Sequence, residues 1–197
     1  MHRQRKIVIG VGGNVGAGKT TACKVFEHFG AHYISADEIG WEILREITHA
    51  LKEKFGDVIM NGETIDKKKL RDVVFEKEEH LEFLNTLSHP LLEKKILEKM
   101  MKIESGVVVL DAALLFDFRL VFKHVDYPIL ITADDALKKK RAMAKGIDSV
   151  LFKKILGFQK NETEMLRHAK YVIKNNGTMD SLREQCQTIY EEIKNDC

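Results

Sequence analysis

The stretch GVGGNVGAGKTT, residues 10–21, restricts the possible folds of this chain more than any other part of its sequence. Within it, Gly13, Gly18, Lys19 and Thr20 fit the P-loop pattern G-x-x-x-x-G-K-[ST]. An apolar, β-branched run at 6–11 precedes the stretch and a helical pattern follows it, which is the context in which this pattern binds nucleotides. A glycine-rich turn that merely caps a helix is the alternative, and the flanking elements disfavour it.

The chemistry of a phosphate site explains each position of this loop. Glycines let the backbone turn tightly, so that successive N–H groups point at phosphate oxygens, and the next helix adds its own unpaired N–H groups. We expect Lys19 to neutralise phosphate charge and the Thr20 hydroxyl to ligate Mg²⁺. The residues expected to hold ATP here are Gly13, Gly16, Ala17, Gly18, Lys19, Thr20 and Thr21.

A P-loop does not by itself say what happens to the nucleotide. The sequence lacks the N-K-x-D motif that reads guanine, which disfavours a GTP-binding switch. A mechanical ATPase would usually be larger or would form a ring. A kinase for small molecules needs an acceptor pocket, a carboxylate that orients the acceptor hydroxyl, and a cationic lid that excludes water.

Strand and helix patterns alternate along the chain, which is typical of an α/β domain with a mainly parallel sheet. A block at about 59–104 has almost no strand signal and predicts an inserted, all-helical subdomain, and charged helices at about 134–168 predict a lid. The remaining parts, about 1–58, 105–133 and 169–197, would form a nucleotide-binding core, so that residues 1–197 make a single domain. Further expected elements are a strand at 31–35, one helix over 36–56, strands beginning at 106 and 127, a short strand within 170–177 and a closing helix at 179–194.

Composition narrows the partners and the compartment. The net charge of +2 is too even to indicate a nucleic-acid-binding protein. No apolar run reaches the roughly 18 residues of a membrane helix, and the first ten residues lack the apolar core of a signal peptide. Cys23, Cys186 and Cys197 are odd in number and widely spaced, which fits neither a disulfide framework nor a metal site. We therefore expect a cytoplasmic protein without nucleic-acid or membrane partners, as a monomer or weak homo-oligomer.

Six further segments, taken in order, carry a specific resemblance. After the P-loop come SADEI (35–39), IDKKKLRDVVF (65–75), LSHPLL (87–92), DAALLFD (111–117), KKKRAMAKGID with KKILGFQ (138–159), and AKYVIKNNGTMDSL (169–182). In this order and spacing the chain resembles the dephospho-coenzyme A kinases nearly end to end. The resemblance implies a three-layer α/β/α fold of the P-loop nucleoside triphosphate hydrolase type with a five-stranded sheet. It also implies ATP, Mg²⁺ and transfer of a phosphoryl group to the ribose 3′-hydroxyl of dephospho-coenzyme A.

The resemblance assigns a role to Asp37, and the place of Asp111 at the end of an apolar strand suggests one for it, although the family does not uniformly keep an acid there. Asp37 matches the family's proposed catalytic base, and we expect it to follow a strand beside the P-loop strand, within reach of an acceptor hydroxyl. Its alternative role is the N-cap of a helix, since it also opens one. Asp111 ends an apolar strand, where a carboxylate can hold Mg²⁺ through water. A helix cap or a structural hydrogen bond is an equal alternative for Asp111.

Other site residues follow from the resemblance. Arg141 in the lid is expected to contact ATP and to stabilise the transferred group, with a solvated cation beside Lys138 to Lys140 as the alternative. His89 at a helix start and Leu114 are expected near the acceptor, although capping or packing is the commoner fate of such a histidine. Asn175 and Gly177 are expected to shape a turn against the adenine.

The sequence also departs from the family pattern. Ser35 replaces the first aspartate of an Asp-Ala-Asp motif, and Lys145 and Lys154 stand where arginines are usual. Lysine keeps the charge but loses the bidentate fork of arginine, so lid contacts with phosphates are open to change. Two alternatives therefore stay open: another P-loop nucleoside or nucleotide kinase, and an ATP-binding regulator that has lost catalysis. The apolar residues of the helical block form its core, and some could line a groove for the pantetheine arm; they include Leu70, Val74, Phe75, Leu81, Phe83 and Leu84.

Overall fold

A computed structural model describes residues 6–195 of the chain, and both the first five residues and Cys197 lie outside the described part. Its centre is a five-stranded sheet in the order β2-β5-β1-β6-β7, in which all four neighbouring pairs are parallel. The strands are β1 (Lys6–Gly12), β2 (His32–Ser35), β5 (Gly106–Asp111), β6 (Tyr127–Thr132) and β7 (Tyr171–Lys174). The predicted parallel, five-stranded α/β fold is confirmed.

The order of the strands corrects one expectation. β5 lies between β1 and β2, so that Asp37 follows the edge strand β2 and not a neighbour of the P-loop strand. The carboxyl ends of the strands nevertheless meet at one edge of the sheet, because the whole sheet is parallel. Ser35 at the end of β2 pairs with Asp111 at the end of β5, which brings these two segments together.

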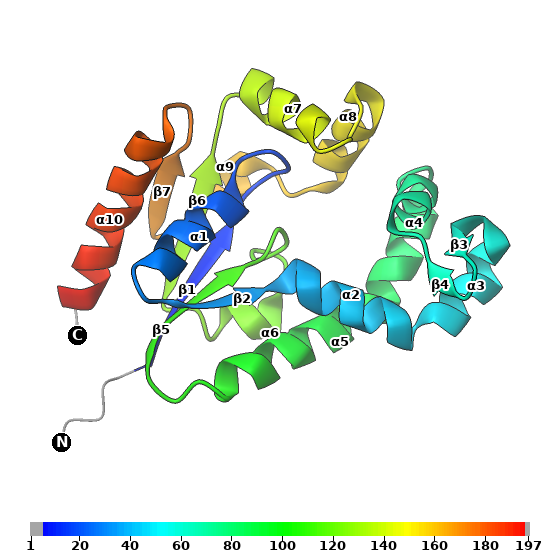
Figure 1. Ribbon diagram of the computed structural model, residues 1–197, viewed down its shortest axis with the longest axis horizontal. Coiled ribbons are helices and arrows are strands. Elements are labelled where there is room, and N and C mark those ends of the chain that lie inside the picture. Colours follow the sequence, from blue (N-terminus) through cyan, green and yellow to red (C-terminus); the bar gives the residue numbers. More distant parts are fainter. Residues whose placement is uncertain (1–5, 196–197) are drawn as a thin grey trace.

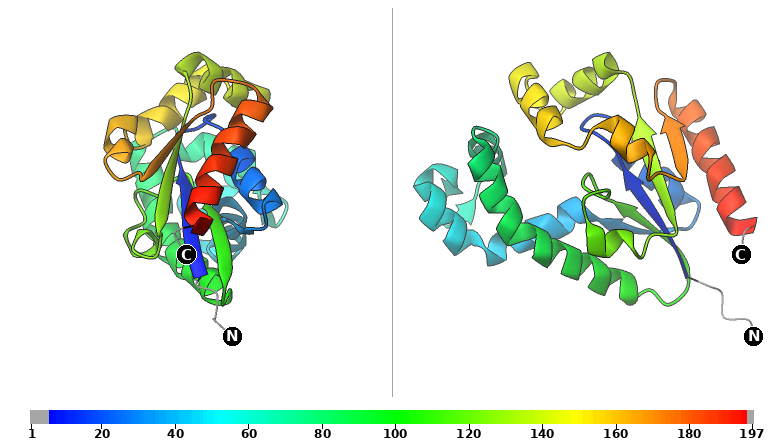
Figure 2. Two further views of the ribbon diagram at one scale, coloured as in Figure 1. Left: turned by 90° about the vertical axis from the view of Figure 1, so that its left-hand side faces the viewer. Right: turned by 180° about the vertical axis from the view of Figure 1, so that it is seen from behind.

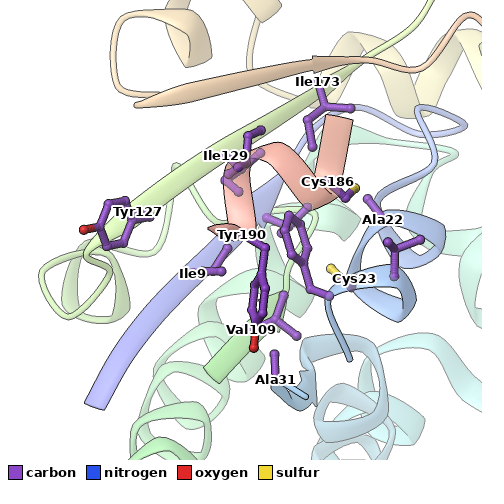
Figure 3. Packing of buried hydrophobic residues seen from close by; sticks show 14 of the residues in the cluster. Ile9, Ala22, Cys23, Ala31, Val109, Tyr127, Ile129, Ile173, Cys186 and Tyr190 are labelled. Carbon is purple, nitrogen blue, oxygen red and sulfur yellow. The ribbon is translucent and has the colours of Figure 1, made fainter. Parts of the chain in front are cut away.

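Helices cover both faces of the sheet and make three layers (Figure 1). On one face lie α1 (Lys19–His28) and α10 (Met179–Asn195), and on the other lie α2 (Ala36–Glu46), α5 (Glu78–Met101) and the short α6 (Arg119–Phe122). Successive strand residues alternate between the two cores: Ile7 and Ile9 belong to the α1–α10 side, and Val8 to the other. Figure 3 shows the first of these cores, where Tyr190 and Cys186 of α10 pack towards Cys23 of α1 and the sheet.

The segment between α2 and β5 forms an arm that projects from the sheet (Figures 1 and 2). It contains α3 (Thr48–Phe55), the 3₁₀ turn η1 (Gly56–Ile59), strands β3 (Met60–Asn61) and β4 (Thr64–Ile65), α4 (Lys67–Val74) and the first half of α5. Buried Leu51, Ile59, Met60, Leu70 and Val74 give it a core of its own. The arm is mostly helical, as expected, but the expectation of an all-helical block was wrong, because β3 and β4 form an antiparallel hairpin.

Two helix boundaries also differ from the sequence expectation. The single helix expected over 36–56 is two helices, with a break at Ile47 between α2 and α3. Helix α5 runs through Pro90, so that His89 lies in the middle of a 24-residue helix and not at its start. The exact domain boundaries stay a prediction.

Three helices make the lid segment: α7 (Asp135–Ala144), α8 (Ser149–Phe158) and α9 (Glu162–Leu166). At its base the Lys138 ammonium is buried and pairs with Asp135 at 2.7 Å and Glu162 at 3.5 Å. These pairs offset the desolvation of the charge and tie α7 to α9. Lys138 is therefore not the solvated cation that the sequence suggested. None of the helices within 6–195 is long and apolar enough to cross a membrane.

Candidate active site

The P-loop turns sharply between β1 and α1 because its glycines adopt a left-handed backbone. Gly16 has φ of 80° and Gly18 has φ of 102°, a region that other residues rarely adopt. A Cβ atom on Gly16 would collide with the Lys138 carbonyl of α7, and one on Gly18 would collide with the Asn175 amide. Glycine is needed at both positions for the turn and also for the close approach of the lid and of the segment after β7.

Side chains from distant segments hold the outer wall of this loop. The Ala17 carbonyl accepts hydrogen bonds from Asn175 Nδ2 at 2.8 Å and from Arg141 Nη1 at 3.4 Å, and Arg141 Nη2 also donates to the Asn175 carbonyl at 2.9 Å. The Val15 N–H donates to Gln159 Oε1 at 2.8 Å. With the Ala17 carbonyl fixed outward, the unpaired N–H groups that open α1 remain for a phosphate.

Arg141 is therefore neither solvated nor isolated. Its guanidinium is half-buried against Ala17 and Asn175, so that the alternative of a solvated surface cation was wrong for this residue. It also lines the cavity beside the P-loop. Its expected contact with ATP stays a prediction, and positioning of the P-loop is a second role that sequence reasoning missed.

A cavity of about 410 Å³ opens beside the P-loop and the start of α1. It brings together residues predicted for ATP from three separate segments of the chain. Those that line it are Gly16, Gly18, Lys19, Thr20, Thr21, Arg141, Asn175 and Gly177, whereas Gly13 and Ala17 do not. Of the other lining residues, sequence reasoning named Lys145 only as a lid cation and missed Ala144, Thr178, Met179 and Leu182. The turn after β7 was the available signal for the last three of these.

The Thr20 hydroxyl and the Asp111 carboxylate form an oxygen-rich corner of this site. Thr20 Oγ1 donates to Asp111 Oδ2 at 2.6 Å, and the Tyr33 hydroxyl donates to the same oxygen at 3.2 Å. Mg²⁺ in nucleotide sites takes one or two protein oxygens and completes its shell with phosphates and water. The pair fits such an ion, with Oδ1 of Asp111 facing no protein donor in the described part of the chain. Tyr33 is a positioning residue that sequence reasoning missed.

Asp37 does not cap its helix. The N-cap of α2 is Ser35, whose Oγ accepts from the Glu38 N–H at 3.2 Å. Asp37 keeps solvent-accessible surface in the first turn, although nearby protein atoms partly desolvate its carboxylate, and it makes no hydrogen bond or ion pair within the described residues. The alternative of an N-cap was therefore wrong, and the carboxylate is free to meet a ligand.

The charges around Asp37 oppose one another. Desolvation and the Asp111 carboxylate raise the pKa of Asp37, while Lys19 and Lys145 act to lower it. Desolvation lowers the pKa of Lys19, and the Asp111 and Asp37 carboxylates oppose that shift. Lys19 Nζ also donates to the Asn14 carbonyl at 3.2 Å. Lys19, Asp37, Asp111 and Lys145 thus form one electrostatically coupled group.

A second cavity, of about 600 Å³, lies between the arm and the lid; we call it the acceptor cavity. Lys145 of the lid lines both this cavity and the nucleotide cavity. The remaining walls combine apolar side chains with cations. The apolar residues are Trp41, Leu44, Leu70, Val74, Phe75 and Leu84, the cations are Lys67, Lys68 and Arg71, and Gly146 completes the lining. Phe83 packs in the core of the arm and does not line this cavity, whereas Leu70 and Val74 belong to that core and also line the cavity.

His89 and Leu114, which the resemblance placed at the acceptor, line neither cavity. The His89 ring packs edge-on against Phe118 at 5.4 Å between centroids, and burial lowers its pKa. Leu114 packs against the core on the α5 side of the sheet. Both side chains contribute to packing beneath the site.

Comparison with known proteins identifies the family of this chain. A family model described as Dephospho-CoA kinase matches residues 7–181. The chain belongs to the dephospho-CoA kinase family. The dephospho-CoA kinase of Aquifex aeolicus is 33% identical over 194 residues, which cover 95% of this chain and 98% of that one. That of Leptospira interrogans serovar Lai is 32% identical, covering 96% and 94%.

Solved structures agree with this assignment. The dephospho-CoA kinase from Campylobacter jejuni superposes with a TM-score of 0.71 at 27% identity and covers 98% of this chain and 100% of its own. A shikimate kinase from Acinetobacter baumannii superposes with a TM-score of 0.56 at 19% identity, covering 96% and 94%, which shows a shared fold only.

The structure explains why the dephospho-CoA kinase fold tolerates Ser35 in place of an aspartate. Serine and aspartate are about equally good N-caps, and Ser35 makes the capping bond of α2. The substitution removes one carboxylate near Asp111 and leaves Asp37 in place. Lys145 keeps a positive charge at the point where the two cavities meet.

Proposed function

We propose that this chain transfers the γ-phosphoryl group of ATP to the ribose 3′-hydroxyl of dephospho-CoA, giving coenzyme A and ADP. One observation carries the proposal beyond family membership. The unpaired Asp37 carboxylate is coupled to Lys19 of the P-loop and to Lys145, which lines both the nucleotide and the acceptor cavity. A reaction that joins two ligands needs a base and a cation where the two sites meet.

On the nucleotide side, the chain supplies position and charge. The N–H groups at the start of α1 bind phosphate oxygens, and Lys19 leaves the Asn14 carbonyl for the β- and γ-phosphates. Thr20 and Asp111 would hold Mg²⁺, which when bound neutralises charge on these phosphates. Arg141 and Asn175 keep the loop wall in place through their hydrogen bonds to the Ala17 carbonyl.

On the acceptor side, the cavity suits a ligand that is both anionic and apolar. Lys67, Lys68 and Arg71 provide positive charge beside the Trp41 and Phe75 rings. Asp37 orients the acceptor hydroxyl and takes its proton as the new P–O bond forms, and Lys145 stabilises the charge on the transferred group. Phosphoryl transfer of this kind depends on positioning and electrostatic stabilisation.

The rival functions are not favoured. Another P-loop kinase would share the loop and the lid, but the family match also spans the arm that carries the acceptor cavity. A regulator without catalysis would not need an unpaired carboxylate at Asp37, whose raised pKa disfavours its charged form.

The proposal also covers the cell compartment and the oligomeric state of the chain. We place the chain in the cytoplasm, as a monomer or weak homo-oligomer. Cys23 and Cys186 are buried free thiols, as expected in a reducing compartment.

The test is ADP release from the purified protein given ATP and Mg²⁺, with dephospho-CoA, AMP or shikimate as acceptor. We expect release that rises only with dephospho-CoA. Stimulation by AMP instead would assign the chain to nucleotide phosphorylation. No stimulation by any of these acceptors, in a protein that still binds ATP, would favour the regulator.

A further inference from the structure

A neighbouring cavity of about 480 Å³, which we call the outer cavity, lies next to the acceptor cavity at Trp41 and Lys67. Trp41, Leu44 and Lys67 line both cavities and form their shared wall. The rest of the outer cavity comes from Arg45 of α2 and from four residues of the arm, Thr48, Glu63, Thr64 and Ile65. The outer cavity thus adjoins the acceptor cavity across these three side chains.

One face of α2 runs from Asp37 past Trp41 to Arg45, which lines the outer cavity. Asp37, Trp41 and Arg45 are spaced four residues apart, so that they lie on one side of the helix. At a rise of 1.5 Å per residue, Trp41 lies about 6 Å and Arg45 about 12 Å beyond Asp37 along the axis. A long acceptor with its hydroxyl at Asp37 therefore meets Trp41 first and the outer cavity next.

Lys67 lies in the wall that the two cavities share, and its positive charge is not paired with a carboxylate of residues 6–195. Asp66 caps α4 by accepting from the Lys68 and Lys69 N–H groups at 2.9 and 3.0 Å, which places Lys67 in the first turn. The Lys67 ammonium lies 3.8 Å from the centre of the Trp41 ring. No carboxylate of the described residues pairs with Lys67. The aromatic face positions this cation without neutralising it.

We propose that Lys67, held over Trp41, binds the diphosphate of dephospho-CoA and that the pantetheine arm continues into the outer cavity. This inference rests on the proposed function and adds a subsite to it. A pantetheine arm alternates short apolar stretches with amides and a hydroxyl. The outer cavity offers the matching mixture, with Leu44 and Ile65 beside the Thr48 and Thr64 hydroxyls.

A different route for the arm is available on the lid side. A cavity of about 280 Å³ shares Lys68, Arg71 and Phe75 with the acceptor cavity and is closed by the lid residues Val150 and Lys154. Its shape depends on the position of the lid. The outer cavity is lined by α2 and the arm, without a lid residue, and lies on the Asp37–Trp41 face of α2. These two facts favour the outer cavity.

The charge is tested by Lys67→Met, which keeps the apolar stem of the side chain. We expect the KM for dephospho-CoA to rise about tenfold or more, as for loss of a charge-assisted hydrogen bond, while the KM for ATP stays within about twofold. Lys170→Met is the matched control, because it removes a similar cation–ring contact, 3.9 Å from the Tyr127 ring, away from these cavities. An unchanged KM for dephospho-CoA in Lys67→Met would overturn the assignment of the diphosphate.

The route of the arm is tested by two variants that each add an aromatic ring. Thr64→Phe fills the outer cavity from an exposed strand position, and Val150→Phe fills the lid-side cavity from an exposed helix position. We expect Thr64→Phe alone to raise the KM for dephospho-CoA several-fold, with kcat and melting temperature unchanged. The reverse pattern, or no effect of Thr64→Phe, overturns the route.

Binding gives a readout that does not depend on turnover. Trp41 is the sole tryptophan of the chain, so that intrinsic fluorescence reports on the shared wall. Free pantetheine should change the emission of the wild type but not of Thr64→Phe, and a non-hydrolysable ATP analogue should change neither. A wild type that releases ADP with dephospho-CoA but shows no response to pantetheine contradicts this inference alone. A wild type without such release contradicts the proposed function itself.

Discussion

At the scale of single residues, the proton affinity of Asp37 links the structure to the chemistry. A base in phosphoryl transfer must be ionised before it can accept the hydroxyl proton. Burial and Asp111 work against ionisation, and Lys19 and Lys145 work for it. The pH at which activity appears is therefore a property of these four side chains together.

Lys145→Met tests this balance. Removal of the positive charge raises the pKa of Asp37 further, because Lys145 favours the ionised carboxylate. Since the proposed role of Asp37 as base requires the ionised form, the acid limb of the kcat/KM profile should move to higher pH. Lys154→Met is the control, a lid cation that is absent from the charges acting on Asp37. The same acid limb in both variants would remove Lys145 from the account.

The sequence predicted which residues belong to the site better than it predicted their side-chain contacts. The roles of Lys19 and Thr20 follow from spacing alone, and Asp37 follows from resemblance. The Ser35 cap that frees Asp37, and the Tyr33 bond to Asp111, depend on side-chain directions that no spacing specifies. His89 shows the converse, because a recognised segment placed it near the acceptor whereas its ring packs against Phe118.

At the scale of elements, the P-loop and helix α7 act as one unit. Gly16 touches the backbone of Lys138, and Lys138 in turn joins α7 to α9. Arg141, one turn further along α7, holds the Ala17 carbonyl. The base of the lid is thus packed on the loop that binds phosphate.

Gly16→Ala tests this packing. The added methyl group meets the Lys138 carbonyl and forces an alanine into φ of 80°, so ATP affinity should fall more than tenfold. Gly62→Ala is the matched control, with φ of 61° and no atom within 4 Å of the new Cβ. It should cost only about 1–2 kcal/mol of stability from the left-handed backbone and leave ATP binding unchanged. Titration with a non-hydrolysable ATP analogue measures both, and equal affinities would refute the contact.

Helices and strands could be predicted where their apolar pattern extends over many residues. The strands of the sheet and the helices at 19–28 and 179–195 match their patterns closely. The β3–β4 hairpin was missed because two-residue strands carry no alternation, although a two-residue loop that begins with glycine, here Gly62-Glu63, is a known hairpin signal. The break at Ile47 was missed because the apolar pattern runs on from α2 into α3.

At the scale of the whole molecule, the sheet carries a nucleotide cavity at the P-loop and presents an arm and a lid that share an acceptor cavity. The contacts that assemble it join distant parts of the chain: 144 positions separate Val15 from Gln159, and 158 separate Ala17 from Asn175. A single sequence contains no record of such pairings. Fold class could therefore be predicted, whereas the order of the strands around Asp37 and the wall of the P-loop could not.

The most direct test of the account compares the products of the wild type and of Asp37→Asn by phosphorus NMR, with ATP, Mg²⁺ and dephospho-CoA. We expect the wild type to form a phosphomonoester on the ribose 3′-oxygen, and Asp37→Asn to lose orders of magnitude in kcat while ATP binding persists. The variant should melt no lower than the wild type at pH 7, because the raised pKa means that the ionised carboxylate is disfavoured in the folded state. A phosphate on another oxygen, or near-normal turnover by Asp37→Asn, would contradict the central claim.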